Sequence, residues 1–179
     1  MVGMHATENS HEIPDENPGN LGTLLIVHHS PTDTVRPIVD IVKAACEEAI
    51  AEIAEMYPGG PPRIRVIERQ ALDPDAEELR AADAVIFGTT ANFGYISGAL
   101  KHYFDTLFYQ VNEEKVGTPV SWWIRGGYDT TGAEKALRSI ITGLKWQISA
   151  EPVEFTGAVE PQREKLEDMA QNMVGALLK

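Results

Sequence analysis

Short apolar runs and amphipathic helical patterns alternate along this chain from Leu21 to its last residues. The apolar runs suit buried strands and fall at 23–27, 64–67, 85–87, 119–124 and, more weakly, 152–156. Stretches with a 3.6-residue period follow them at 35–53, 75–82, 97–109, 131–148 and 161–178. Five strand–helix pairs in succession predict an α/β fold, a doubly wound parallel sheet with helices on both faces and right-handed crossovers.

The domain organisation follows from the same pattern. We expect one domain over residues 21–179, because neither an internal repeat nor a second pattern interrupts it. Residues 1–20 are polar and acidic, which predicts a disordered tail, and their lack of an apolar stretch argues against a signal peptide. Pro58–Pro62 is expected to stop the first helix. No run approaches the roughly 18 apolar residues of a membrane helix, so we expect no membrane partner and a cytoplasmic protein.

Composition excludes several function classes. The net charge of −12 and the pI near 4.8 make a nucleic-acid surface improbable, since that needs a basic face. An acidic surface serves solubility, the favoured interpretation, or docking to a basic redox partner. The single cysteine, Cys46, cannot build a disulfide framework or a cysteine-ligated metal site. Its alanine-rich helical surroundings favour a buried small hydrophobe over a reactive thiol.

Residues 84–105 form the most informative segment. The apolar run 85–87 is expected to end at Gly88, and a small polar turn with one aromatic follows: Thr89, Thr90, Ala91, Asn92, Phe93 and Gly94. Ser97 is a suitable N-cap for the next helix. A strand, a turn and a helix in this order place backbone N–H groups and a flat ring at the carboxyl edge of a parallel sheet, where α/β folds bind ligands.

This segment resembles the loop that flanks the isoalloxazine ring in flavodoxin-like FMN proteins. It is most similar to the branch of tryptophan-repressor-binding-protein-type quinone reductases and NAD(P)H-dependent FMN reductases. The matching positions are Gly88, Thr89, Phe93, Gly94, Gly98 and Lys101. Thr90 stands where these families usually have proline. The resemblance implies strand order 2-1-3-4-5 and non-covalent FMN.

A second turn, between the first strand and the first helix, is rich in hydroxyl groups: Ser30, Thr32 and Thr34, with Asp33 and Val35 beside them. A helix N-terminus offers free N–H groups and a partial positive charge, so this turn suits a phosphate, although N-capping alone explains it equally well. The spacing is similar to the family's phosphate loop, which usually has glycine in place of Asp33. That carboxylate faces solvent, caps the helix or weakens FMN binding, and Arg36 could screen it. Of the adjacent His28 and His29, one is either a helper near the phosphate or, more simply, a structural histidine.

A third, glycine-rich turn follows the fourth strand and contains Arg125, Gly126, Gly127 and Tyr128. Glycines let the backbone approach a flat ligand, and in the resembling families this turn lines the flavin edge. Tyr128 is interpreted either as a wall of that site or as an ordinary surface side chain. Trp122 and Trp123 point to opposite faces of a strand and are expected in the core.

The resemblance implies an oxidoreductase in which NAD(P)H reduces bound FMN and FMN reduces a quinone or similar small acceptor. No side chain need act as acid or base, and no metal is expected. Two alternatives remain: a flavodoxin-type electron carrier that docks a redox partner protein, and a flavodoxin-fold binding module without cofactor. A homo-oligomer is possible.

Overall fold

The computed structural model describes residues 22–57, 63–111 and 113–178. The predicted tail at 1–20 and the predicted helix stop at 58–62 lie outside them. The strands are β1 (Gly22–His28), β2 (Ile64–Gln70), β3 (Ala84–Asn92), β4 (Tyr95–Ile96), β5 (Pro119–Gly126), β6 (Gln147–Ile148) and β7 (Val153–Thr156). The helices are α1 (Arg36–Met56), α2 (Ala76–Ala81), α3 (Gly98–Val111), α4 (Thr131–Gly143) and α5 (Arg163–Gly175), with short 3₁₀ turns at Glu160–Gln162 and Ala176–Leu178.

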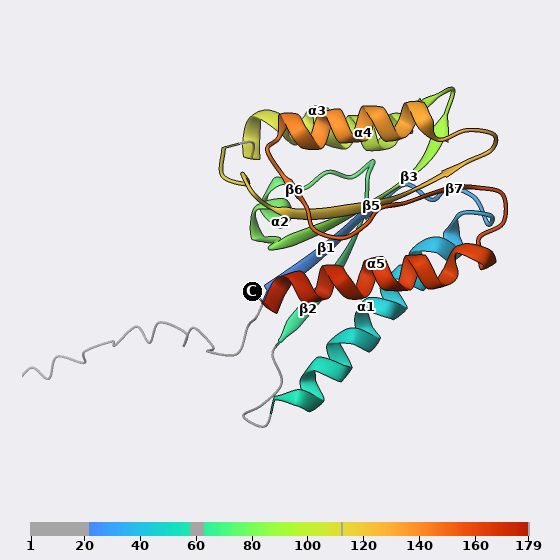
Figure 1. Ribbon diagram of the computed structural model, residues 1–179. Coiled ribbons are helices and arrows are strands. Elements are labelled where there is room, and N and C mark those ends of the chain that lie inside the picture. The colour runs from blue at the N-terminus through green and yellow to red at the C-terminus, as the bar shows by residue number, and fades with distance from the viewer. Residues whose placement is uncertain (1–21, 58–62, 112, 179) are drawn as a thin grey trace, which may run out of the picture.

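The sheet confirms the predicted fold class. Its order is β2-β1-β3-β5-β6, all parallel, and β7 pairs with the other end of β5, so β6 and β7 together occupy the fifth position. This is the flavodoxin-like order 2-1-3-4-5. The short β4 pairs antiparallel with the end of β3. Helices α3 and α4 cover one face of the sheet, and α1 and α5 cover the other (Figure 1).

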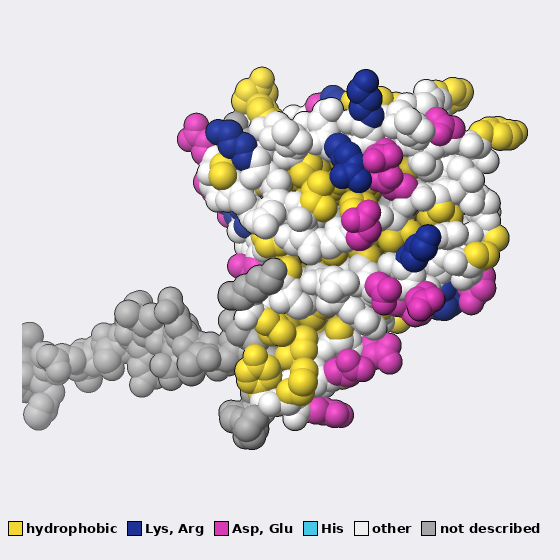
Figure 2. Space-filling model, in the orientation of Figure 1, with side chains coloured by type: hydrophobic (Ala, Val, Ile, Leu, Met, Phe, Trp, Pro, Cys, Tyr) yellow, Lys and Arg dark blue, Asp and Glu magenta, His cyan; other side chains and the backbone are white. Residues whose placement is uncertain are grey.

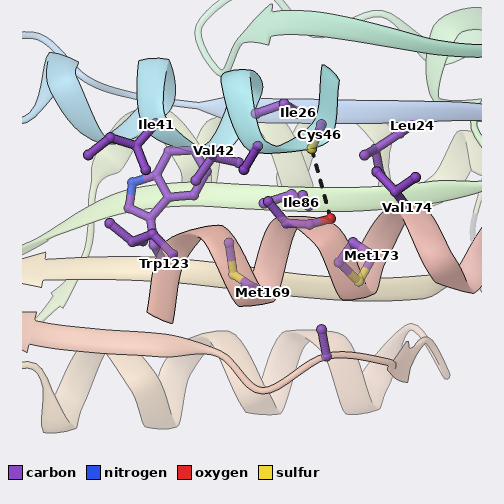
Figure 3. Packing of buried hydrophobic residues seen from close by; sticks show 14 of the residues in the cluster. Leu24, Ile26, Ile41, Val42, Cys46, Ile86, Trp123, Met169, Met173 and Val174 are labelled. Atoms are coloured by element: carbon purple, nitrogen blue, oxygen red, sulfur yellow. Dashed lines mark hydrogen bonds between the residues drawn. The ribbon is translucent and has the colours of Figure 1, made fainter. Parts of the chain in front are cut away.

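Two hydrophobic cores lie on the two faces of the sheet. On one face, α1 and α5 pack with Leu24, Ile86 and Trp123 (Figure 3). On the other, α2, α3 and α4 pack with Phe87 and Trp122. The side chains of a strand alternate between faces, so the central strands β1, β3 and β5 contribute to both cores. The prediction that both tryptophans are core residues is confirmed.

The fourth helix is shorter than predicted. The periodic pattern suggested 131–148, but α4 ends at Gly143, and Lys145 takes a left-handed conformation with φ of 55°. Trp146 then stacks on Phe87, with ring centroids 5.8 Å apart, and draws the chain back to the sheet. Gln147 and Ile148 therefore pair with β5 as β6, so tertiary packing overrides the helical period.

The third strand is longer than predicted. Gly88 was expected to end it, but β3 continues to Asn92 and pairs with β5 as far as Ala91. A Cβ on Gly88 would lie 1.9 Å from the ring of Trp123. Glycine is required here for the space that the indole occupies, and the backbone does not turn.

Candidate functional site

Three turns meet the carboxyl edge of the sheet. They follow β1 (residues 29–35), β3 (93–94) and β5 (127–130), and these strands are neighbours in the order β1-β3-β5. Because β3 lies between the other two, the turns after β1 and β5 flank its end. The backbone N–H of His29 donates to the carbonyl of Gly88 at 3.0 Å, which ties the first turn to β3. The three sequence-predicted segments therefore share one edge.

The turn after β3 is the tip of a tight hairpin. Asn92 pairs with Tyr95, and the two residues between them, Phe93 and Gly94, have φ of 52° and 75°. Positive φ at both central residues is what a type I′ hairpin requires. The Phe93 ring is fully exposed, and hydrophobic side chains protrude from the end of the molecule that carries this hairpin (Figure 2). The tip presents a flat apolar ring to solvent.

Two contacts fix the hairpin to the fold. The buried Thr89 hydroxyl accepts from the N–H of Ser97 at 3.1 Å and donates to the carbonyl of Thr90. Ser97 in turn accepts from the N–H of Leu100 at 3.2 Å, so the predicted N-cap of α3 is confirmed. On the other side, a Cβ on Gly132 would lie 2.0 Å from the carbonyl oxygen of Gly94, so the first turn of α4 packs directly on the tip.

A groove of about 490 Å³ separates the hairpin from the turn after β5. One wall is Ala91, Asn92, Phe93 and Gly94, and the other is Gly127, Tyr128 and Asp129. The Tyr128 ring is fully exposed on this second wall. Hydrogen bonds from the hydroxyl and N–H of Thr131 lower the pKa of the Asp129 carboxyl and hold it at the start of α4. Two facing walls, each with one exposed ring, suit a flat aromatic ligand.

Two predicted residues near this groove have structural partners. The half-buried Arg125 donates from its guanidinium to the carbonyl of Gly157 at 3.1 and 3.2 Å, which braces the turn after β7. Gly126 lies under the next turn, where a Cβ would be 2.7 Å from the carbonyl oxygen of Asp129. Both residues support the turn that carries Tyr128.

The turn after β1 leaves backbone donors free. The carbonyl of Thr32 accepts from the N–H groups of Val35 and Arg36. Among the described residues, no protein atom accepts from the N–H groups of four others: Ser30, Thr32, Asp33 and Thr34. These donors stand at the N-terminus of the 21-residue helix α1, whose partial positive charge favours an anion.

The side chains of this turn divide into buried and exposed sets. Thr32, Asp33 and Thr34 are exposed, whereas Ser30 and Val35 are buried. The N-cap position of α1 is Val35 and no side chain caps it, so the idea that Asp33 is the cap is wrong. The two threonine hydroxyls remain available to a ligand.

His28 joins this turn to the sheet. Its Nδ1 lies 3.0 Å from Ser30 Oγ, and its Nε2 lies 3.1 Å from Glu68 Oε1 and 3.2 Å from the amide of Gln70. Burial lowers the pKa of His28, and the hydrogen bond to Glu68 opposes that shift. Sequence reasoning missed Glu68 and Gln70. The available signal was two polar residues at the carboxyl end of the strand expected beside β1.

The remaining polar chemistry is limited. Cys46 is a buried small hydrophobe, as predicted: burial raises the pKa of its thiol to about 12, and its Sγ lies 3.9 Å from the carbonyl of Ala170 (Figure 3). Over the ranges 22–57, 63–111 and 113–178, no three His, Cys, Asp or Glu side chains gather as a metal site would need. None of the helices in those ranges is both long and apolar enough to cross a bilayer.

The sheet order and the three open turns at one edge define a flavodoxin-like protein. The chain belongs to the NADPH-dependent FMN reductase family, whose model matches residues 36–157. This confirms the resemblance inferred from residues 84–105. The match begins at Arg36, so the interpretation of residues 30–35 depends on their own geometry.

Solved structures share the fold at low identity. A flavodoxin from the domain Archaea aligns with a TM-score of 0.68 at 9% identity, covering 88% of this chain and 99% of its own. An oxidoreductase from Corynebacterium diphtheriae aligns with a TM-score of 0.61 at 17% identity, covering 88% and 97%. The rubredoxin:oxygen oxidoreductase of Desulfovibrio gigas aligns with 0.68 at 17%, covering 87% of this chain and 36% of its own. No curated protein sequence matches the chain significantly.

Proposed function

We propose that this protein binds FMN at the carboxyl edge of its sheet and passes electrons from NAD(P)H to a quinone or similar small acceptor. Membership of the FMN reductase family supports the cofactor and the donor. The observation that carries the proposal is the set of N–H groups before α1 that have no acceptor among the described residues, at the same sheet edge as a groove walled by two exposed rings. When bound, FMN supplies the chemistry, accepting hydride and releasing electrons.

The turn after β1 fits the phosphate. Free N–H groups from Ser30 to Thr34 and the hydroxyls of Thr32 and Thr34 provide donors without a lysine or arginine in the turn. The exposed Asp33 opposes this, because its carboxylate repels a phosphate dianion. Arg36, the first residue of α1, would offset part of that charge if its guanidinium reached the phosphate.

The groove fits the ring. Phe93 and Tyr128 stand on opposite walls and would limit how the ring tilts and how much water reaches it. The backbone of residues 91–94 and of Gly127 borders the same space and would offer polar groups to the ring edge. An open face between the two aromatic side chains would admit nicotinamide, which needs reacting atoms about 3–3.5 Å apart.

The electron carrier is the second candidate, and the net charge of −12 favours it because acidic surfaces dock basic partners. Direct reduction separates the two. Bound flavin in a reductase should lose its visible absorbance within seconds of adding NAD(P)H and regain it with a quinone. A carrier with FMN demonstrably bound would not respond to millimolar NAD(P)H alone. Tyr128→Ala should change the rate with the acceptor more than the affinity for FMN, since Tyr128 is away from the phosphate turn.

Cofactor binding itself is tested by titration. We expect FMN at 100 times its dissociation constant to stabilise the protein by about 2.7 kcal/mol. Thr32→Ala and Thr34→Ala should each weaken FMN binding by about 1 kcal/mol or more without changing riboflavin binding. Asp33→Gly should tighten FMN binding. The control is Thr142→Ala, an exposed threonine near the far end of α4. Equal affinities for FMN and riboflavin in the unaltered protein would mean that the turn holds no phosphate. If FMN did not stabilise the protein at all, the interpretation as a binding module without cofactor would replace the proposed function.

A further inference from the structure

His28 is engaged on both ring nitrogens at the start of the phosphate turn. It is 1% exposed, at the end of β1. Nε2 faces Glu68 Oε1 at 3.1 Å, and Nδ1 faces the hydroxyl of the buried Ser30 at 3.0 Å. Ser30 is therefore the residue of this turn whose hydroxyl is hydrogen-bonded to a titratable side chain of the sheet.

The hydrogen-bond partners of His28 decide which of its ring nitrogens carries the proton when the imidazole is neutral. Lys43 Nζ donates to Glu68 Oε2 at 2.9 Å, and this contact lowers the pKa of the Glu68 carboxyl, so Glu68 is an acceptor. Nε2 of His28 must then carry a proton to donate to Glu68. The Gln70 side-chain nitrogen lies 3.2 Å from the same Nε2, so this assignment requires the Gln70 amide to be turned over, with its oxygen toward the ring. Nδ1 is left bare and accepts from Ser30. A hydroxyl has a single proton, so Ser30 has none for a phosphate.

Protonation of His28 reverses the direction of the hydrogen bond between its Nδ1 and Ser30 Oγ. An imidazolium donates from both nitrogens, so Nδ1–H would donate to Ser30 Oγ and free the hydroxyl proton. We propose that His28 is a proton-linked positioning residue, which makes Ser30 a donor to the FMN phosphate only when the imidazole is charged. This rests on the proposed FMN site. It predicts that the phosphate anchor tightens as pH falls and that bound phosphate raises the pKa of His28.

The surroundings set where this switch operates. Facing His28 are Glu68 and Gln70 from β2, Arg36 from α1, His29 in the turn and the Trp123 ring from β5, with Lys43 acting through Glu68. Burial, Arg36 and His29 lower the pKa of His28 below 6.5, and Glu68 raises it. Because binding would raise that pKa, the gain in affinity is complete below the free-state pKa and disappears as pH rises through the bound-state pKa.

The first test compares FMN dissociation constants between pH 5 and 8 for the unaltered protein and for His28→Gln, by quenching of flavin fluorescence. The second ionisation of the phosphate near pH 6 affects both proteins alike, so the ratio of their constants isolates His28. We expect the dissociation constant of His28→Gln divided by that of the unaltered protein to be about fivefold larger at pH 5 than at pH 8. A factor of about five corresponds to one ordinary hydrogen bond. Ser30→Ala should lose the same pH dependence, and His29→Gln should keep it. A ratio independent of pH would overturn the proposal.

A second readout needs no variant at the buried site. The His28 imidazole can be followed by NMR titration of the unaltered protein, alone, with FMN and with riboflavin. FMN should raise the His28 midpoint and riboflavin should not. If FMN bound tightly and more strongly than riboflavin but did not move the titration midpoint of His28, only the proposed role of His28 would be refuted, and the phosphate site would stand. Absence of any preference for FMN over riboflavin would instead refute the phosphate site.

Discussion

At the scale of single residues, Gly88 couples the core to the site. It pairs with both β1 and β5, and the space above its Cα is filled by the Trp123 ring. The carbonyl of the same residue accepts the hydrogen bond from the His29 N–H, which ties the turn after β1 to β3. A side chain here would push on the indole under the edge that carries all three turns.

We expect Gly88→Ala to destabilise the protein by about 3 kcal/mol, because its Cβ would lie 1.9 Å from the ring of Trp123 and neither strand can move freely. Urea denaturation followed by circular dichroism measures this. The control is Gly143→Ala at the end of α4, where a Cβ meets nothing within 4 Å, and it should be neutral or stabilising by about 0.5–1 kcal/mol. Equal stability of the two variants would show that the Trp123 ring yields at no cost.

At the scale of elements, the β3–β4 hairpin combines strain with exposure. Phe93 adopts φ of 52°, a left-handed conformation that costs an ordinary residue about 1–2 kcal/mol. The contacts of Thr89 with Ser97 and of Gly132 with Gly94 maintain this shape. The Phe93 ring is fully exposed, so no burial of the ring offsets this strain.

Phe93→Asn should be more stable than Phe93→Ala by about 1 kcal/mol, since asparagine tolerates the left-handed region and favours type I′ turns. Both variants remove the ring, so both should bind FMN more weakly than the unaltered protein and to a similar extent. Chemical denaturation and FMN titration measure the two effects. If asparagine and alanine were equally stable, the hairpin would not hold residue 93 in this conformation.

At the scale of the molecule, one sheet joins two cores. Trp123 lies in the α1/α5 core, whereas Trp122 and Trp146 lie in the opposite core. The three central strands contribute side chains to both cores, so one core cannot unfold without disrupting the sheet on which the other packs. The expectation of a single domain over residues 21–179 therefore has a direct thermodynamic consequence.

We expect the two cores to unfold in one cooperative transition. Trp123→Phe leaves tryptophan only in the α3/α4 core, and the double variant Trp122→Phe/Trp146→Phe leaves it only in the α1/α5 core, so excitation at a wavelength selective for tryptophan reports on one core at a time. In each variant the fluorescence midpoint in urea should coincide with that from circular dichroism. Two midpoints within one protein would mean that the cores unfold separately.

The sequence by itself determined the order of the five main strand–helix pairs, the α/β class and the family, but not the short strands β4 and β6. Its apolar runs and helical periods are local properties, and the residues from Gly88 to Lys101 carried the resemblance. The hydroxyl-rich turn, the Phe93 turn and the glycine-rich turn were each visible, because each interrupts a pattern at the end of a predicted strand.

Only the tertiary structure decided what those turns contact. The end of α4 at Gly143 depends on the stacking of Trp146 on Phe87, and the need for glycine at 88 depends on Trp123, 35 residues away along the chain. The link from Glu68 through His28 to Ser30 requires β2 to lie beside β1. Local pattern records which residues form strands and helices, whereas the contacts that shape the site are made between strands that only the assembled sheet brings together.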